Sequence, residues 1–306
     1  MLYTARIWAI GSFPEIKIEQ EQFAKLKLAR VCLSGALAIE EKYEILISNY
    51  LELEKECLNI TSNLIIRNTI GYESFFDITL SLNRRVVNLL SSTKLYIDQI
   101  KHHVKACIPD DEELSHKVES LFSNEYDATF EYRFMEALRN YVQHRGLAVH
   151  SPKVGGKWTS LEEDRQYEFK TSIFTLKSEV ENDKAFKKKI LNEMPEKVDL
   201  LYSVRTYIGS ISKVHGDIRK LLSNTVEESR NLIASIIKEY EDINSGNSTG
   251  LTAVCSLPMK PISKTIETFP LLLKWDDIRV SLINKNRTLI NLPKTYVSSN
   301  TDKKES

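Results

Sequence analysis

The chain has 306 residues, which is enough for one large domain or two smaller ones with a substantial core. Lysine plus arginine and aspartate plus glutamate are balanced at 42 each, so no overall positive charge indicates a nucleic-acid partner, and any anion site must be local. Hydrophobic residues make up 42% of the chain, with only 10 glycines and 8 prolines, a composition typical of a helix-rich soluble protein.

The cysteines and the apolar segments exclude further classes of protein. Cys32, Cys57, Cys107 and Cys255 are far apart and form no CxxC pair, which argues against a zinc site or a disulfide framework and fits a reducing compartment. The mildly apolar residues 1–10 are too short for a signal sequence or a membrane span. No other window reaches spanning length, so we expect a cytoplasmic protein without a membrane partner.

Helical periodicity dominates the first half of the chain, after a short strand or extended lead-in at residues 1–14. The predicted helices cover residues 17–66, 73–108, about 112–122, and 130–144. The first is long for a globular protein, so a break is expected near Gly35 or residues 59–61. Gly146 is expected to end the fourth helix as a left-handed C-cap.

The second half mixes loops, strands and helices. Ser151–Lys157 is interpreted as an exposed loop, and Tyr167–Leu176 as a short strand or hairpin. Further helices are expected from Asp183 to about Asn192, from Pro195 to about Leu222, and from Thr225 to Tyr240. Strand-like runs follow at Phe269–Leu273, Ile278–Ile283 and Thr288–Leu292.

The predicted fold is therefore all-α, an antiparallel helical bundle with minor β-structure and a small C-terminal extension. The helical domain is expected to cover residues 1–244. Residues 245–306 are expected to hold a flexible linker at 245–250, the extension, and a disordered polar tail.

The fourth helix carries the most informative motif of the chain. Arg139 is followed directly by Asn140 and, after three more residues, by His144, at the polar end of an amphipathic helix. A loose pairing of arginine and histidine arises about once by chance in such a chain, and Arg145 with His150 also matches it. Requiring the asparagine and a fixed spacing lowers that expectation to roughly a few per cent.

This motif resembles the R-N-x-x-x-H signature of HEPN ribonucleases, all-α domains found in toxins, anticodon nucleases, RNA-guided CRISPR effectors and antiphage proteins. The resemblance covers about residues 73–240. It implies a metal-independent endoribonuclease with an RNA substrate and no cofactor, acting as a toxin-like or antiphage effector. It also implies a neutralising or sensor partner protein that holds the effector in check.

The residue types suit RNA cleavage without a metal ion. The ribose 2′-OH must lose a proton and attack phosphorus, and the leaving 5′-oxygen must gain one. His144 suits the proton transfers, and Arg139 suits the charge on the phosphoryl oxygens. Asn140 could orient the imidazole or contact phosphate, as the family implies.

One helix alone serves this chemistry poorly. Arg139 and His144 point about 140° apart around an ideal helix, so their side chains do not converge on one phosphate. HEPN domains solve this with two facing helices. Because this chain has one such motif, the resemblance implies a homodimer with isologous pairing.

Other polar residues could support the site. Arg85, Asn88 and His103 share a polar stripe on the second long helix, although a solvated or interhelical face is the simpler interpretation. Gln143 and Arg145 flank the motif. The alternative function is a non-catalytic helical module that binds RNA or a partner protein through the same polar face.

Overall fold

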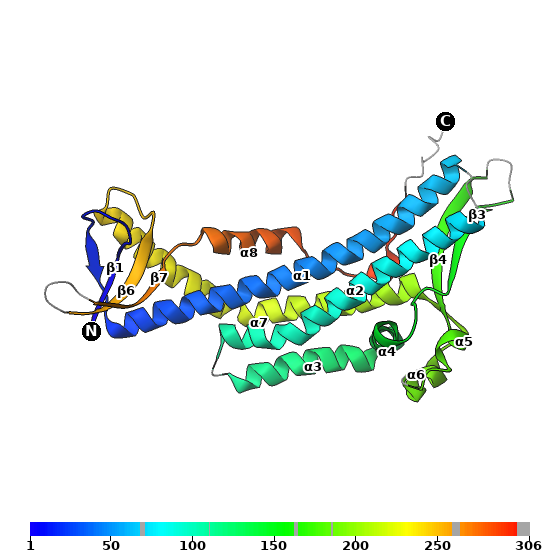
Figure 1. Ribbon diagram of the computed structural model, residues 1–306, viewed down its shortest axis with the longest axis horizontal. Coiled ribbons are helices and arrows are strands. Elements are labelled where there is room, and N and C mark those ends of the chain that lie inside the picture. The colour runs from blue at the N-terminus through cyan, green and yellow to red at the C-terminus, as the bar shows by residue number, and fades with distance from the viewer. Residues whose placement is uncertain (68–70, 110, 162–164, 185, 259–263, 299–306) are drawn as a thin grey trace. The chain divides into compact units, whose positions relative to one another are not determined.

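The computed structural model describes residues 1–67, 71–109, 111–161, 165–184, 186–258 and 264–298 (Figure 1). The described chain is mostly helical, as predicted, and its β-structure forms two small antiparallel sheets. The helices are α1 Gln20–Arg67, α2 Tyr72–Cys107, α3 Glu112–Ala128, α4 Phe130–His144, α5 Lys177–Val180, α6 Lys188–Glu193, α7 Leu200–Ile243 and α8 Lys274–Lys285. The strands are β1 Leu2–Ile7, β2 Glu15–Lys17, β3 Ser151–Trp158, β4 Tyr167–Leu176, β5 Lys197–Asp199, β6 Leu251–Leu257 and β7 Lys264–Pro270.

The chain forms two compact units, each assembled from three separate stretches. Unit 1 comprises Met1–Glu44, Leu95–Val118 and Asp217–Arg287. Unit 2 comprises Ile45–Lys94, Glu119–Gly216 and Thr288–Ser306, and it contains the R-N-x-x-x-H motif. The predicted division of the chain at residue 245 stays a prediction.

The first predicted helix forms without the expected break, as a single helix of 48 residues. In unit 1, a Cβ at Gly35 would lie 2.8 Å from the carbonyl oxygen of His103 and 3.0 Å from Cys107 Sγ. Glycine is therefore needed for the close approach of α1 and α2. This packing offsets the roughly 1 kcal/mol that glycine costs in a helix relative to alanine.

The sheet of unit 1 has the strand order β2-β1-β6-β7, and all of its neighbouring strands are antiparallel. The segment before β6, predicted as a flexible linker, is a hydrogen-bonded turn. Ser245, Gly246 and Gly250 have positive φ there, and the Ser248 hydroxyl donates to a carboxylate oxygen of Glu241 at 2.6 Å. The turn leads α7 directly into the sheet.

The sheet of unit 2 has the order β3-β4-β5. The loop predicted at residues 151–157 is wrong, because this segment is β3 and pairs along its length with β4. Pro152 and the glycines of this segment indicated a loop. However, β3 is an edge strand, which tolerates proline. A Cβ at Gly156 would lie 2.2 Å from the ring of Tyr167, so glycine admits that ring. The predicted strand over residues 167–176 is confirmed.

The helices after β4 also differ from the predicted ones. The helix expected from Asp183 begins only at Lys188. Pro195 precedes β5 instead of starting a helix, and Asp199 caps α7 by accepting a hydrogen bond from the backbone N–H of Tyr202 at 3.0 Å. The helix then continues through the gap expected between residues 222 and 225. Ser223 fits within it because its hydroxyl donates to the carbonyl of Lys220 at 2.9 Å.

The strand predicted at residues 278–283 is wrong, because these residues lie in α8. Their alternation of apolar and polar residues indicated a strand. In the structure, however, the buried side of the helix holds an ion pair instead of the apolar residues. Arg279 is 8% exposed and pairs with the fully buried Asp276, whereas Ile278 is 55% exposed. Residues 288–291 form no strand, a 3₁₀ turn follows at Leu292–Lys294, and the predicted disordered tail over residues 299–306 lies outside the described residues.

The core of unit 2 fixes the helix that carries the motif. Side chains from α1, α2, α4 and α7 are almost wholly buried there, at 1% exposure or less: Leu53, Leu89, Phe134, Leu138 and Tyr207. Among the helices that the structure describes, none is both long enough and apolar enough to cross a lipid bilayer.

Candidate functional site

The predicted amphipathic helix at residues 130–144 is confirmed as α4. Thr129 caps its first turn, since the hydroxyl oxygen accepts a hydrogen bond from the backbone N–H of Tyr132 at 3.3 Å. Its buried face consists of Tyr132, Phe134, Met135, Ala137 and Leu138. The motif residues therefore lie on a helix that is anchored by its opposite side.

The left-handed cap predicted at Gly146 is wrong. Arg145 is the C-cap, with φ −136°, and Gly146 does not have a positive φ. A Cβ at Gly146 would lie 2.3 Å from the hydroxyl oxygen of Tyr141. The glycine is thus required because the tyrosine ring covers the chain where it leaves α4.

Asn83 of α2 fixes the segment after α4. Its carbonyl oxygen accepts hydrogen bonds from the backbone N–H groups of Ala148 and Val149, both at 2.9 Å. Its amide donates to the carbonyl of Val149 at 3.1 Å, and the Thr175 hydroxyl donates to the carbonyl of Ala148 at 2.7 Å. Asn83 is 1% exposed, so water cannot replace these bonds.

We expect Asn83→Ala to lower the free energy of unfolding by about 2–3 kcal/mol, because it leaves two buried N–H groups and one carbonyl without this partner. Urea denaturation measures the difference. Asn88→Ala is the matched control, since Asn88 is an exposed amide on the same helix. It should change the stability by no more than about 0.5 kcal/mol. Equal effects of the two substitutions would contradict this role for Asn83.

Arg139 lies against its own helix. One of its terminal nitrogens donates to the side-chain oxygen of Gln143 at 3.1 Å, and its Nε lies 3.9 Å from a carboxylate oxygen of Glu136. The side chain is only 12% exposed, yet this Nε is buried without a hydrogen-bond partner. The Nε atoms of Arg6, Arg30, Arg85 and Arg133 are in the same state, so this feature does not by itself mark Arg139 as functional.

Glu136 connects Arg139 to α7. The hydroxyl of Tyr207, 71 residues along the chain, donates a short hydrogen bond to the second carboxylate oxygen of Glu136. Burial, and then the negative charge of Glu136, raise the pKa of Tyr207 well above its usual value. The phenol therefore stays protonated and holds the carboxylate that faces Arg139. The sequence analysis did not single out Tyr207, because no local pattern links it to the motif.

Asn140 and His144 lie on the exposed side of α4. Neither side chain forms a hydrogen bond or an ion pair with any residue that the structure describes. No such contact joins Arg139 to either of them. One copy of the chain thus presents an unpartnered imidazole and amide beside a fixed guanidinium, without assembling the three groups around one point.

Of the other predicted supporting residues, Asn88 lies exposed on α2, and the rest have contacts or surroundings of their own. Arg85 forms ion pairs with Glu52 at 2.7 Å and Glu56 at 3.6 Å. Arg145 pairs with Asp183 at 3.7 Å and stays 62% exposed. His103 belongs to unit 1, where burial, and then the charge of neighbouring groups, lower the pKa of its imidazole. Gln143 is thus the only member of this predicted set that contacts a motif side chain within the described residues.

His150 belongs to the looser arginine–histidine pair, and its imidazole is hydrogen-bonded to the backbone. Its Nδ1 accepts a hydrogen bond from the N–H of Leu176 at 3.1 Å. Burial lowers the pKa of this imidazole, which favours the neutral form that can accept the bond. His144, in contrast, is free to meet a ligand.

The polar face of the unit 2 sheet carries a group of lysines, which we call the lysine face: Lys153, Lys170 and Lys197. None of the three forms an ion pair with a described side chain. The Lys197 ammonium lies 3.6 Å from the centre of the Phe174 ring. Burial, and then the adjacent Lys153, lower the pKa of Lys197, while Asp199 opposes the shift. Crowded ammonium groups of this kind favour an anionic partner.

Comparison of the chain with family models, with curated proteins and with solved structures found no match. The case for a functional site therefore depends on the residues and contacts of unit 2.

Proposed function

We propose that the chain is a metal-independent endoribonuclease of the HEPN class, in which Arg139, Asn140 and His144 act on RNA within a homodimer. The observation that supports the proposal is that His144 and Arg139, near the same end of α4, differ in exposure and in contacts. His144 is exposed and unpartnered, whereas Arg139 is nearly buried and held by Gln143 and Glu136. A group that exchanges protons needs access to the substrate, and a group that stabilises charge benefits from being fixed in advance.

The roles follow from this contrast. His144 takes the proton of the ribose 2′-OH or gives one to the leaving 5′-oxygen. Arg139 stabilises the negative charge that builds on the phosphoryl oxygens through the part of its guanidinium that remains exposed. Asn140, one turn before His144, holds the imidazole or a phosphate oxygen. Glu136 and Tyr207 act through Arg139 and are positioning residues.

The geometry of one helix supports a site shared between two copies. Arg139 is fixed along the helix surface and has no contact with His144. We propose that two copies of α4 face each other across a twofold axis, so that Arg139 of one chain and His144 of the other grip the same phosphate. By resemblance, such an effector acts in the cytoplasm under the control of a neutralising or sensor partner protein.

The test uses purified full-length chain and end-labelled RNA in excess EDTA. We expect cleavage that leaves 2′,3′-cyclic phosphate ends, since the 2′-oxygen is the nucleophile. The absence of cleavage with any RNA tested, together with retained binding, would favour the non-catalytic alternative.

A mixing experiment tests the shared site. Arg139→Ala and His144→Ala chains, each inactive alone, are mixed in equal amounts and allowed to exchange. Half of the dimers then contain one chain of each variant. Such a dimer has one intact site where the wild-type dimer has two, so about a quarter of wild-type activity should return. No recovery, despite mixed dimers being detected by native mass spectrometry, would place Arg139 and His144 of one chain in the same site and reject the composite arrangement.

The lysine face favours a second candidate, a module that binds RNA without cutting it. Lys153, Lys170 and Lys197 could hold backbone phosphates whether or not α4 is catalytic. The EDTA experiment separates the two, because binding alone leaves the labelled RNA intact.

A further inference from the structure

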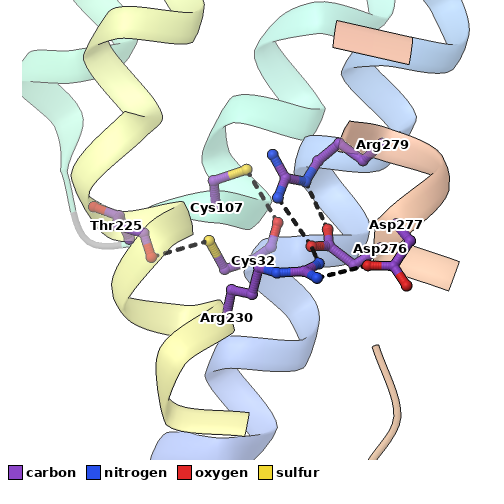
Figure 2. A network of polar contacts seen from close by, with 7 residues as sticks. All are labelled: Cys32, Cys107, Thr225, Arg230, Asp276, Asp277 and Arg279. Carbon is purple, nitrogen blue, oxygen red and sulfur yellow. Dashed lines mark hydrogen bonds and ion pairs between the residues drawn. The ribbon is translucent and has the colours of Figure 1, made fainter. Parts of the chain in front are cut away.

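Cys32 of α1 and Cys107 of α2 are neighbours in unit 1, and both are free thiols (Figure 2). The Cys107 thiol donates to the carbonyl oxygen of Cys32 at 3.4 Å, and the same sulfur would lie 3.0 Å from a Cβ on Gly35. The Cys32 thiol points to the carbonyl oxygen of Thr225 at 3.9 Å. The Cys107 sulfur is therefore in contact with the backbone of Cys32, and a disulfide requires the Cys32 side chain to turn from Thr225 towards Cys107.

The surroundings distinguish the two sulfurs. A hydrogen bond from the Cys107 thiol lowers the pKa of Cys32 to about 7; burial opposes this shift, and Ser229 and the charge of Arg279 assist it. The charge of Asp276 acts in the opposite direction. The same pairing raises the pKa of Cys107. Cys32 is therefore the more acidic thiol of the pair, and Cys107 is the one that keeps its proton more readily.

A cavity lies close to this region of unit 1, although neither cysteine lines it. It has a volume of about 340 Å³, and its lining includes Ala36, Arg230 and Arg279. Ala36 follows Cys32 by one helical turn on α1, and Arg279 is near enough for its charge to act on Cys32. Cys32 and Cys107 are 3% and 4% exposed, so a small oxidant reaches them only when the packing around them opens locally.

We propose that Cys32 and Cys107 form an oxidation site for hydrogen peroxide that closes to an intrachain disulfide. The Cys32 thiolate attacks one peroxide oxygen; an S–O bond forms, the O–O bond breaks, and the departing hydroxide takes a proton to become water. Cys32 is oxidised to the sulfenic acid. Cys107 then loses its proton and attacks the Cys32 sulfur; the S–S bond forms, the S–O bond breaks, and a second water leaves. Two thiols and one peroxide give one disulfide and two waters.

The test treats the native full-length chain with hydrogen peroxide, blocks the remaining thiols in denaturant, and maps peptides by mass spectrometry. We expect a Cys32–Cys107 linked peptide, lighter than the two reduced peptides by about 2 Da, that dithiothreitol removes. Cys57 and Cys255 are internal controls, because both are buried and burial raises the pKa of Cys57 to about 12. Peroxide that leaves Cys32 and Cys107 fully alkylated, or that oxidises all four cysteines alike, would overturn the proposal.

Two variants assign the order of the steps. Cys107→Ser should stop at a Cys32 sulfenic acid that dimedone traps, and Cys32→Ser should leave Cys107 unmodified under the same conditions. Trapping of Cys107 in the second variant would reject Cys32 as the reactive thiol. The peptide map of the wild-type chain decides the disulfide itself even if one of these variants folds poorly.

Discussion

His144→Ala should lower the rate of RNA cleavage by at least about 100-fold, because general acid–base catalysis contributes roughly 10²–10⁴-fold. Arg139→Ala should cause a loss of similar size, since removing one fixed donor to a developing oxyanion costs about 10²–10³-fold. Initial rates with a labelled RNA in EDTA measure both effects. Because His144 has no protein partner among the described residues, its loss should leave the stability of the chain unchanged.

The control for this prediction is His102→Ala, which also removes an exposed imidazole from a helix surface. It should cleave RNA at the wild-type rate. Arg139→Lys adds a second comparison, since it keeps the charge but loses the planar guanidinium that can grip two phosphate oxygens, and it should remain impaired. Full activity in His144→Ala would remove the basis for a HEPN-type mechanism.

Asp276→Ala should produce the largest loss of stability, about 3–5 kcal/mol. The side chain of Asp276 is 0% exposed, and its two oxygens accept from Arg279, at 2.6 and 2.9 Å, and from Arg230 (Figure 2). Removing the carboxylate leaves the two guanidinium groups without their shared counter-ion. Asp277→Ala is the matched control, because Asp277 pairs with Arg230 from a side chain that is 59% exposed. It should cost no more than about 1 kcal/mol.

The pH dependence gives an independent check on Asp276. Burial alone would raise its pKa, but hydrogen bonds from Arg279 and Arg230 outweigh burial, and the pKa lies below the usual value. The stabilisation is therefore complete above the unfolded-state pKa of about 3.9 and is lost as the pH falls through the lower folded-state pKa. In urea titrations, the gap between wild type and Asp276→Ala should narrow below about pH 4. A gap that stays constant at acid pH would contradict the ionised pairing.

The sequence predicted the long helices and α4 well because their apolar residues recur with helical period and because burial follows that period. The prediction failed in α8 and β3, where an ion pair or a close ring contact, and not the apolar pattern, decides which residues are buried. Arg279 is buried by its ion pair with Asp276, so the apolar alternation in α8 indicated a strand. Gly156 admits the ring of Tyr167, so β3 had the composition of a loop.

The candidate site shows the same limit. Gln143 was within reach of sequence reasoning, because it lies four residues from Arg139 on the same helix. The role of Tyr207 and the contact of Asn83 with the segment after α4 were not, because both join residues across a long stretch of chain. Contacts of this kind leave no periodic trace in a single sequence.

The interleaved make-up of the two units has a practical consequence for genetic dissection. Each unit needs three stretches of chain that are separated by stretches belonging to the other. A clone that spans residues 119–216 would encode α4 but would omit residues 45–94, and with them Asn83. No single truncation yields either half whole, so deletion libraries should give insoluble products, and the activity must be mapped with point substitutions in the intact polypeptide.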